Sequence, residues 1–439
     1  MGIQTILWVL LASQSISTGE YRVRRERLMS EHADGIVLLH ARSTAAGLTD
    51  HGFKQDAAFF YFTGLSNQPS AILALDGPAR ESVLFVPEAP PSFGSRVEGV
   101  SLVPGKSSAR TWGLDRVVSW DGFEAYVKDR MAHGVTKLYL DRSRRPVPPG
   151  NPDGLWPMAG DKTLWRRALE KAFPEARLES AAATIQAMRW VKSDAEVAVL
   201  RRVAEASASA LLAGMKSVDV DVRQRSSEMA VVAGCIEAGA EGPSFWPWTM
   251  SGPNAHASSL TRSFYDYHHL DRTMKTGELV RVDVGCDLGH YEGDVGRTVP
   301  VSGAFRPEQA EAWDLLIAAY QAGLGAMRAG ITRAELAEVS RAAVRKAQPT
   351  LVSEHAKKAA RAMLGGGDNV WHVHGVGVDG GEERLPRLEA GSVIAFEPGF
   401  SVDDDAYYLE DMILITETGH EILTKGLPYT AEEIARAMK

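Results

Sequence analysis

The chain has 439 residues, of which 45% are hydrophobic and 24% are charged, a composition that excludes a disordered or fibrous protein. Domains of about 150 residues would give two or three units. The 48 Lys and Arg residues against 56 Asp and Glu residues leave a net charge of −8, which argues against nucleic acid as a partner because polyanions bind to basic surfaces. The two cysteines, Cys235 and Cys286, are too few for a disulfide framework, a CxxC zinc site or an iron–sulfur cluster. Any bound metal must therefore have carboxylate and histidine ligands.

The N-terminus carries the longest apolar run, Ile6–Ala12, followed by the small polar stretch Ser13–Ser17. This pattern predicts a signal peptide over residues 1–18 and an exported, periplasmic protein. Residues 2–21 contain no Lys or Arg, so the alternative is an apolar helix at the start of a cytoplasmic protein. The lack of cysteine pairs does not decide between the two, because many periplasmic proteins have none. The run is far shorter than the roughly 20 residues of a membrane-spanning helix, and we expect no transmembrane segment.

Residues 20–165 have the pattern of a first α/β domain. Short apolar stretches bounded by Gly, Pro and Asp predict four strands, at Gly35–His40, Ala71–Leu75, Ser82–Val86 and Lys137–Leu140. We expect residues 166–182 to form a helical connection and residues 183–439 to form a second domain.

The second domain contains two expected helix starts. Ser193 and Glu196 form a capping box, in which each side chain accepts a hydrogen bond from a free backbone amide, and Thr332 and Glu335 repeat the pattern. A helix beginning at Pro307 should end before Gly330. Strands are expected over 278–287, 294–301, 392–397 and 406–416.

Those strands contain carboxylates where apolar residues are usual. Asp283, Asp294, Glu397 and Glu410 all lie beside Val, Ile, Phe or Leu, and His374 occupies a similar stretch. A buried carboxylate costs several kcal/mol unless a cation or hydrogen-bond donors compensate for it. Each acid alone could be an edge-strand charge facing water, but four such acids together with a histidine favour a metal site.

The charges suit two divalent ions, because four carboxylates balance two M²⁺ and one imidazole adds a neutral ligand. Oxygen-rich ligation with one nitrogen favours Mn²⁺, Zn²⁺, Co²⁺ or Fe²⁺ over thiol-seeking metals. Two ions that share a water lower its pKa and polarise a carbonyl oxygen. The residues therefore predict hydrolysis at a dinuclear metal site.

The motifs also resemble those of a known family. The segments Val282-Asp-Val-Gly-Cys286, Tyr291-x-Gly-Asp294-x-x-Arg297-Thr298, His374-Gly-Val-Gly, Glu397-Pro-Gly and Leu409-Glu-Asp411 are similar to those of the pita-bread metallopeptidases, family M24. Within the family the chain looks most like the aminopeptidase P and prolidase group, which cleaves Xaa-Pro bonds, and Phe53–Leu65 resembles the N-terminal domain of that group. The resemblance implies an α/β (α+β) protein with a creatinase/aminopeptidase-P-like N-terminal domain and a C-terminal pita-bread domain.

The resemblance also implies a role for each candidate residue. Asp283 would bind one metal and His374 the other, and Asp294 and Glu410 would bridge the two. Glu397 would bind the second metal and help to take a proton from the bridging water, so that a metal-bridged hydroxide attacks the peptide carbonyl. Mn²⁺ is the metal we expect first, with Zn²⁺ and Co²⁺ as alternatives. Relatives commonly form dimers or tetramers, which implies a homo-oligomer.

Several positions around the expected ligands depart from the family pattern. Two histidines usual near the metal histidine are replaced by Val370 and Gly381, and a usual tyrosine and arginine are replaced by Ser401 and Tyr408. We expect His372, which is offset by two from the usual position, to act as a substitute catalytic residue. The family's upstream His-Tyr pair reads Asp266-Tyr267, and nearby histidines are candidate substrate-binding residues: His256, His268 and His269.

The sequence therefore predicts a dinuclear-metal exopeptidase that hydrolyses Xaa-Pro bonds in peptides or dipeptides. Two alternatives remain open. The same metal site could act on another amide or C–N substrate, because the groups that orient the substrate differ. The chain could also be a weakly active or inactive homologue that serves as a binding module, although a decayed enzyme would be expected to lose metal ligands, and all five are present.

Overall fold

The computed structural model describes residues 16–42, 53–87, 102–141, 161–256, 267–382 and 386–439. The chain divides into two compact units, with the boundary between Arg189 and Trp190. The expected signal peptide lies mostly outside the described residues and stays a prediction.

The N-terminal unit is built around a six-stranded mixed sheet with the strand order β4-β3-β2-β1-β5-β6. The four strands expected from the sequence are present within one residue of their expected bounds, and β4 and β6 complete the sheet. Its strands are β1 (Ile36–His40), β2 (Ile72–Asp76), β3 (Glu81–Val86), β4 (Arg116–Ser119), β5 (Lys137–Leu140) and β6 (Arg177–Ser180). Helices of this unit are α2 (Thr18–Glu31), α3 (Ala57–Thr63), α4 (Lys106–Thr111), α5 (Phe123–Ala132), α6 (Asp161–Ala172) and α7 (Ala182–Trp190), with the 3₁₀ turn η3 (Trp120–Gly122).

Residues 166–182 do not form a separate connection. They include the end of α6 and strand β6, which pairs in parallel with β5 at the edge of the sheet. The amphipathic helix α6 contributes Leu169, and the loop after it contributes Phe173, to the core beside the sheet. A four-residue edge strand carries too short a pattern to be recognised by alternation alone.

The C-terminal unit has a seven-stranded sheet in the order β13-β14-β15-β12-β9-β8, with β16 paired to β15, and a small sheet in the order β11-β10-β7. The strands are β7 (Gly242–Pro243), β8 (Trp248–Ser251), β9 (Leu279–Val284), β10 (Cys286–Leu288), β11 (Tyr291–Glu292), β12 (Val295–Pro300), β13 (Trp371–Gly375), β14 (Val393–Val402), β15 (Asp405–Ile415) and β16 (His420–Ile422).

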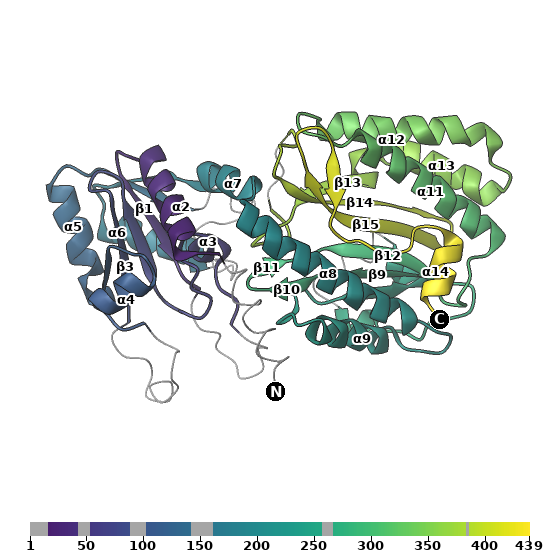
Figure 1. The fold of residues 1–439 in the computed structure, drawn as a ribbon, viewed down its shortest axis with the longest axis horizontal. Helices are drawn as coiled ribbons and strands as arrows, with labels where there is room; N and C mark the ends of the chain where they lie inside the picture. The colour runs from purple at the N-terminus through teal and green to yellow at the C-terminus, as the bar shows by residue number, and fades with distance from the viewer. Residues whose placement is uncertain (1–15, 43–52, 88–101, 142–160, 257–266, 383–385) are drawn as a thin grey trace, which may run out of the picture. The chain divides into compact units, whose positions relative to one another are not determined.

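Two groups of helices pack against this sheet. Helix α8 lies against β9 and β12, and α9 packs on α8 and against β7 and β8. Helices α11, α12 and α13 lie together beside β13 and β14 (Figure 1). The capping boxes at Ser193 and Thr332 are present as expected. Helices are α8 (Asp194–Lys216), α9 (Gln224–Glu237), α11 (Pro307–Ala326), α12 (Arg333–Ala347), α13 (Glu354–Gly365) and α14 (Ala431–Ala437), with the 3₁₀ turns η4 (Gly252–Ala255), η5 (Tyr267–Leu270), η6 (Gln348–Thr350) and η7 (Gly367–Val370).

The strand expected over 278–287 is interrupted at Gly285, where the chain passes from β9 in the large sheet to β10 in the small one. A Cβ atom at position 285 would lie 1.8 Å from the Gly293 carbonyl oxygen and 2.3 Å from Ser244 Oγ. Only glycine fits this close approach. The break lies two residues after Asp283 and brings the loop that contains Asp294 back beside it.

The cysteines form a disulfide between Cys235 of α9 and Cys286 of β10, with their Cα atoms 5.5 Å apart. The sequence expectation that the chain lacks a cysteine pair is therefore wrong. The two residues are separated by 51 positions, and only the packing of α9 against the small sheet makes them neighbours. The bond ties this helix to the strand that follows Asp283.

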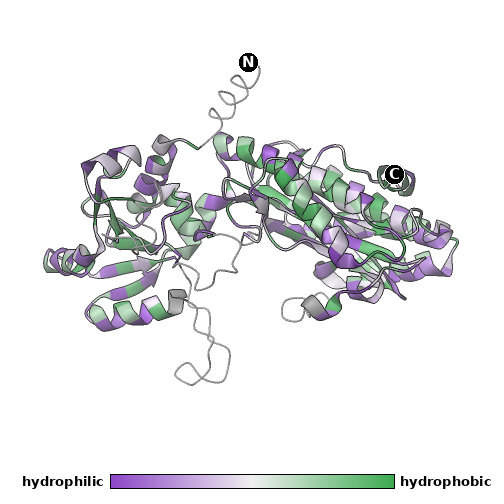
Figure 2. Ribbon diagram, turned by 90° about the horizontal axis from the view of Figure 1, so that it is seen from below, coloured by the Kyte–Doolittle hydropathy of each residue, from purple (hydrophilic) through white to green (hydrophobic). Residues whose placement is uncertain are grey.

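Hydrophobic residues gather in the interior of each unit, and the outward turns of the helices are largely hydrophilic (Figure 2). The larger core is made by β9, β12, β14 and β15 together with α8 and α11. Trp313, Tyr320 and Phe396 are fully buried in it. Among the described residues, no helix has the length and apolar character needed to cross a membrane.

Candidate metal centre

The candidate ligands lie in one row across neighbouring strands of the large sheet. His372 of β13 pairs directly with Glu397 of β14, and Gly296 of β12 pairs with Glu410 of β15 on one side and with Asp283 of β9 on the other. Residues directly opposite in antiparallel strands have Cβ atoms about 4.5–5.5 Å apart. The register therefore gathers carboxylates from separate parts of the chain on one face.

His374 lies two residues beyond His372, on the same face of β13. Its Nδ1 faces the carbonyl oxygen of Gly375 at 3.0 Å, which leaves Nε2 directed at the acids. The distances from Nε2 are 3.3 Å to Glu397, 3.4 Å to Asp294 and 3.9 Å to Glu410. A histidine whose second nitrogen is held by a backbone carbonyl has the arrangement that metal ligands usually show.

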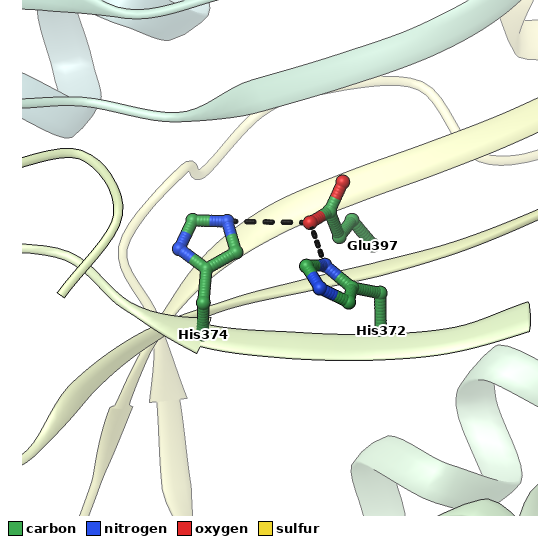
Figure 3. A group of neighbouring side chains, drawn as sticks. All are labelled: His372, His374 and Glu397. Atoms are coloured by element: carbon green, nitrogen blue, oxygen red, sulfur yellow. Dashed lines mark hydrogen bonds and ion pairs between the residues drawn. The ribbon is translucent and has the colours of Figure 1, made fainter. Parts of the chain in front are cut away.

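His372 also reaches the site. Its Nδ1 contacts the Glu397 oxygen that faces His374 Nε2, so that two imidazoles converge on one carboxylate oxygen (Figure 3). The His372 side chain is 27% exposed, whereas the His374 side chain is 11% exposed. His372 therefore lies at the open side of the group.

Glu410 provides a test of whether the residues fit a metal. The side chain is fully buried, its Oε2 accepts a 2.6 Å hydrogen bond from the Tyr408 hydroxyl, and its Oε1 has no hydrogen-bond partner among the described residues. A buried carboxylate oxygen without a donor is strongly unfavourable unless a cation compensates for it. The donor set, four carboxylates and imidazole nitrogen, suits divalent metal ions.

The pKa values of the site residues reflect the same shortage of compensating positive charge. Burial and repulsion from neighbouring carboxylates raise the pKa values of Asp294 and Glu410 well above their ordinary range, although His374 and Tyr408 act in the other direction. Burial opposes ionisation of Glu397, but hydrogen bonds with His372 and His374 outweigh it and lower the pKa of this carboxyl. Burial also opposes protonation of His374, yet Glu397 and Asp294 raise its pKa to about 9. The protein alone provides too little positive charge for these acids.

Asp283 has a partner that sequence reasoning missed. Arg281 lies two residues earlier on β9, on the same face, and forms a 2.5 Å ion pair with the Asp283 carboxylate. Its guanidinium carbon lies 3.5 Å from the centre of the Tyr408 ring. The two-residue spacing in the apolar strand Leu279–Val284 was the available signal, because alternate strand residues share a face.

A second buried arginine supports the strand that carries Glu410. Arg297 donates to the backbone oxygens of Gly296 at 2.8 Å and Glu410 at 2.7 Å. It also pairs with Asp411 at 3.0 Å, and both side chains are fully buried. Tyr320, Tyr429 and Thr424 donate further hydrogen bonds to Asp411. This network fixes β12 against β15 beside the row of candidate ligands.

The other candidate residues are not among the paired positions of this row. His256 follows η4 and is partly buried, and His269 is exposed in η5. The His268 side chain and Asp266 lie outside the described part of the chain. Gly381 is exposed, and Ser401 pairs with Ala406 near the hairpin end of β14. The substrate-binding roles of the three histidines stay predictions.

Comparison with known proteins identifies the family. A family model for "Metallopeptidase family M24" matches residues 198–417, and one for "Aminopeptidase P, N-terminal domain" matches residues 21–139. The Xaa-Pro aminopeptidase of Escherichia coli is 29% identical over 96% of this chain and 98% of its own length. The Xaa-Pro dipeptidase of Pyrococcus furiosus is 28% identical over 55% of this chain and 65% of its own length. A structure of E. coli aminopeptidase P with the inhibitor Pro-Leu aligns with a TM-score of 0.75 at 24% identity, covering 97% of this chain and 98% of that one.

The fold and the cluster of acids and histidine define a metal-dependent hydrolase. The chain belongs to metallopeptidase family M24, and its N-terminal unit is of the aminopeptidase P type. The sequence prediction of this family, and of an α/β protein with an aminopeptidase-P-like domain before a pita-bread domain, is confirmed.

Proposed function

We propose that the protein is an Xaa-Pro aminopeptidase that uses two divalent metal ions. The observation that carries the proposal is the position of His374 Nε2, which lies within 3.9 Å of carboxylates from three separate segments. The full-length similarity to an Xaa-Pro aminopeptidase supports the substrate class. The N-terminal domain match favours an aminopeptidase over a dipeptidase.

The residues that would hold the ions are Asp283, Asp294, His374, Glu397 and Glu410. Two ions bound there would lower the pKa of a shared water and polarise the peptide carbonyl. The carboxylate of Glu397 lies at the open end of the row, next to His372, where it can accept a proton. Tyr408 holds the carboxylate of Glu410 in place, and Arg281 holds that of Asp283. Mn²⁺ is the ion we propose first, with Zn²⁺ and Co²⁺ as alternatives.

Turnover by the purified full chain, stripped of metal and reloaded with Mn²⁺, Zn²⁺ or Co²⁺, tests the proposal. The substrates would be Ala-Pro-Ala, Ala-Pro and Ala-Ala-Ala, with Glu410→Gln as the matched control that keeps the side-chain shape. We expect cleavage of Ala-Pro-Ala before proline, weaker cleavage of Ala-Pro, and none in the control. Two bound ions without cleavage of any proline substrate would overturn the proline specificity and favour another amide substrate. Failure of the wild-type chain to bind any of these ions would overturn the proposal altogether.

We also propose that the protein functions in an oxidising compartment outside the cytoplasm. The Cys235–Cys286 disulfide supports this location, because structural disulfides form and persist in exported proteins and are rare in the cytosol. Alkylation of free thiols in freshly lysed cells, followed by mass spectrometry of the two cysteine peptides, measures the bond directly. Two alkylated cysteines would contradict the proposal.

A homo-oligomer is likewise proposed, and light scattering of the purified chain would measure its mass.

A further inference from the structure

We propose that His372 is a direct metal ligand, so that the site has two imidazole ligands and six protein ligands in all. This inference rests on the proposed dinuclear site, and it goes beyond the five ligands assigned above. It gives His372 a role in metal binding, in place of the substitute catalytic role expected from the sequence.

The geometry of β13 directs both histidines to the same point. His372 and His374 are two residues apart, and their ring centroids are 5.5 Å apart with an angle of 49° between the ring planes. His372 Nδ1 contacts Glu397 Oε1, and His374 Nε2 lies 3.3 Å from the same oxygen. One atom from each of the three side chains lies within 4.8 Å of the other two. Figure 3 shows both rings turned toward this oxygen.

The separation between His374 and Glu397 suits two ligands of one ion. Bonds of about 2.0–2.2 Å in tetrahedral or octahedral geometry place neighbouring ligand atoms about 3.0–3.5 Å apart, and the 3.3 Å between His374 Nε2 and Glu397 Oε1 is in that range. Once the two imidazole nitrogens have released the protons that they share with Glu397, they and the carboxylate oxygen present three lone pairs to one partly buried point, which is the environment that a cation binds.

A count of nitrogen atoms strengthens the case. Two overlapping groups have ligand spacing: His372, His374 and Glu397 form one, and Asp294, His374 and Glu410 form the other. His374 belongs to both, but its Nδ1 is engaged with the Gly375 carbonyl, so that only Nε2 can bind an ion. If His374 serves the ion at Asp294 and Glu410, His372 is the nitrogen that remains beside Glu397. Mn²⁺ was proposed first for a site with five ligands and one imidazole; a second imidazole would move the preference toward the alternatives Co²⁺ and Zn²⁺.

Paramagnetic proton NMR of the Co²⁺-loaded full chain tests the inference without an activity measurement. Each imidazole bound to Co²⁺ retains one ring N–H, whose resonance is strongly shifted and disappears in D₂O. We expect two such resonances in the wild type and one in His372→Asn. The asparagine amide can still donate a hydrogen bond to Glu397, so this variant separates metal ligation from mere orientation of the carboxylate. His133→Asn, which changes an exposed histidine of the N-terminal unit, should retain both.

Equilibrium dialysis with Zn²⁺ and with Co²⁺ provides the second measurement. We expect two ions per chain in the wild type, and in His372→Asn a weakening of one site by roughly 100-fold or more, since even residues that only orient a ligand cost about 10–100-fold. A single exchangeable resonance in the wild type, with unchanged affinity in His372→Asn, would overturn the inference and leave His372 as a positioning residue. That result would leave two-ion binding and cleavage of Ala-Pro-Ala intact, whereas failure of the proposed function would remove them in the wild type.

Discussion

The guanidinium carbon of Arg281 lies 3.5 Å from the centre of the Tyr408 ring. Arg281 pairs with Asp283, and the Tyr408 hydroxyl contacts Glu410 at 2.6 Å and Glu397 at 3.1 Å. The stacked pair thus contacts three of the proposed metal ligands. It fits beside Gly296, where a Cβ atom would lie 2.2 Å from the Tyr408 ring.

Removing the Tyr408 hydroxyl should weaken metal binding. In Tyr408→Phe the ring stays over Arg281, but Glu410 loses its described hydrogen-bond donor. We expect a loss of about 10–100-fold in metal affinity, as for other groups that orient a ligand, measured by dialysis of Zn²⁺. Tyr407→Phe is the matched control, because the Tyr407 hydroxyl contacts His355. Equal affinities in the two variants would contradict the role assigned to Tyr408.

Removing the Arg281 charge should destabilise the metal-free protein more than the metal-loaded protein. Arg281→Met leaves Asp283 buried without its cation, and breaking a buried pair costs about 3–5 kcal/mol. A bound divalent ion would replace most of the lost positive charge. Urea unfolding with and without Zn²⁺ measures both free energies of unfolding. A loss that is the same in both states would argue that Arg281 acts through packing on Tyr408 alone.

The metal-free protein should lose stability as the pH rises from 5 to 9. The folded-state pKa values of Asp294, Glu410 and His374 are all raised, so their protonated forms favour the native state. That contribution is fully present below the unfolded pKa of each group, about 4 for the acids and 6.5 for histidine, and it disappears as the pH rises through the folded values. Each group contributes at most about 1.4 kcal/mol per pH unit.

Thermal unfolding of the metal-free chain across this pH range measures the effect. Because metal ions bind the deprotonated acids, the gain in melting temperature on adding Zn²⁺ should increase with pH. Glu410→Gln cannot ionise at this position and should show a shallower decline. A metal-free melting temperature that rises between pH 5 and pH 9 would contradict the assignment.

Reduction of the disulfide should destabilise the C-terminal unit. A bond that closes a loop of 51 residues contributes about 4 kcal/mol in the chain-entropy model. Since the sequence contains 2 cysteines, dithiothreitol acts on this bond alone. We expect a lower melting temperature in dithiothreitol for the wild type and no response in Cys235→Ser/Cys286→Ser. Identical melting curves for the oxidised and reduced wild type would show that the bond adds little.

The sequence predicted much of this protein, because local patterns carried the information. Alternation and turn residues predicted strands such as Lys137–Leu140 and Ser82–Val86, and the Ser193 and Thr332 capping boxes predicted two helix starts. The four acids and His374 were recognisable because each interrupts an apolar strand, where an uncompensated charge is unfavourable. The order of the motifs was enough to predict the family.

Only the tertiary structure decided which residues meet. The register of β13 with β14 placed His372 opposite Glu397, and strand order placed Arg281 against Tyr408, although the two are distant in sequence. The Cys235–Cys286 bond depended on how α9 packs against β10, which no local pattern encodes. Contacts of this kind are set by strand pairing and by the filling of space around Gly285 and Gly296. For that reason the candidate ligands could be picked out from the sequence, whereas the groups that contact them could not.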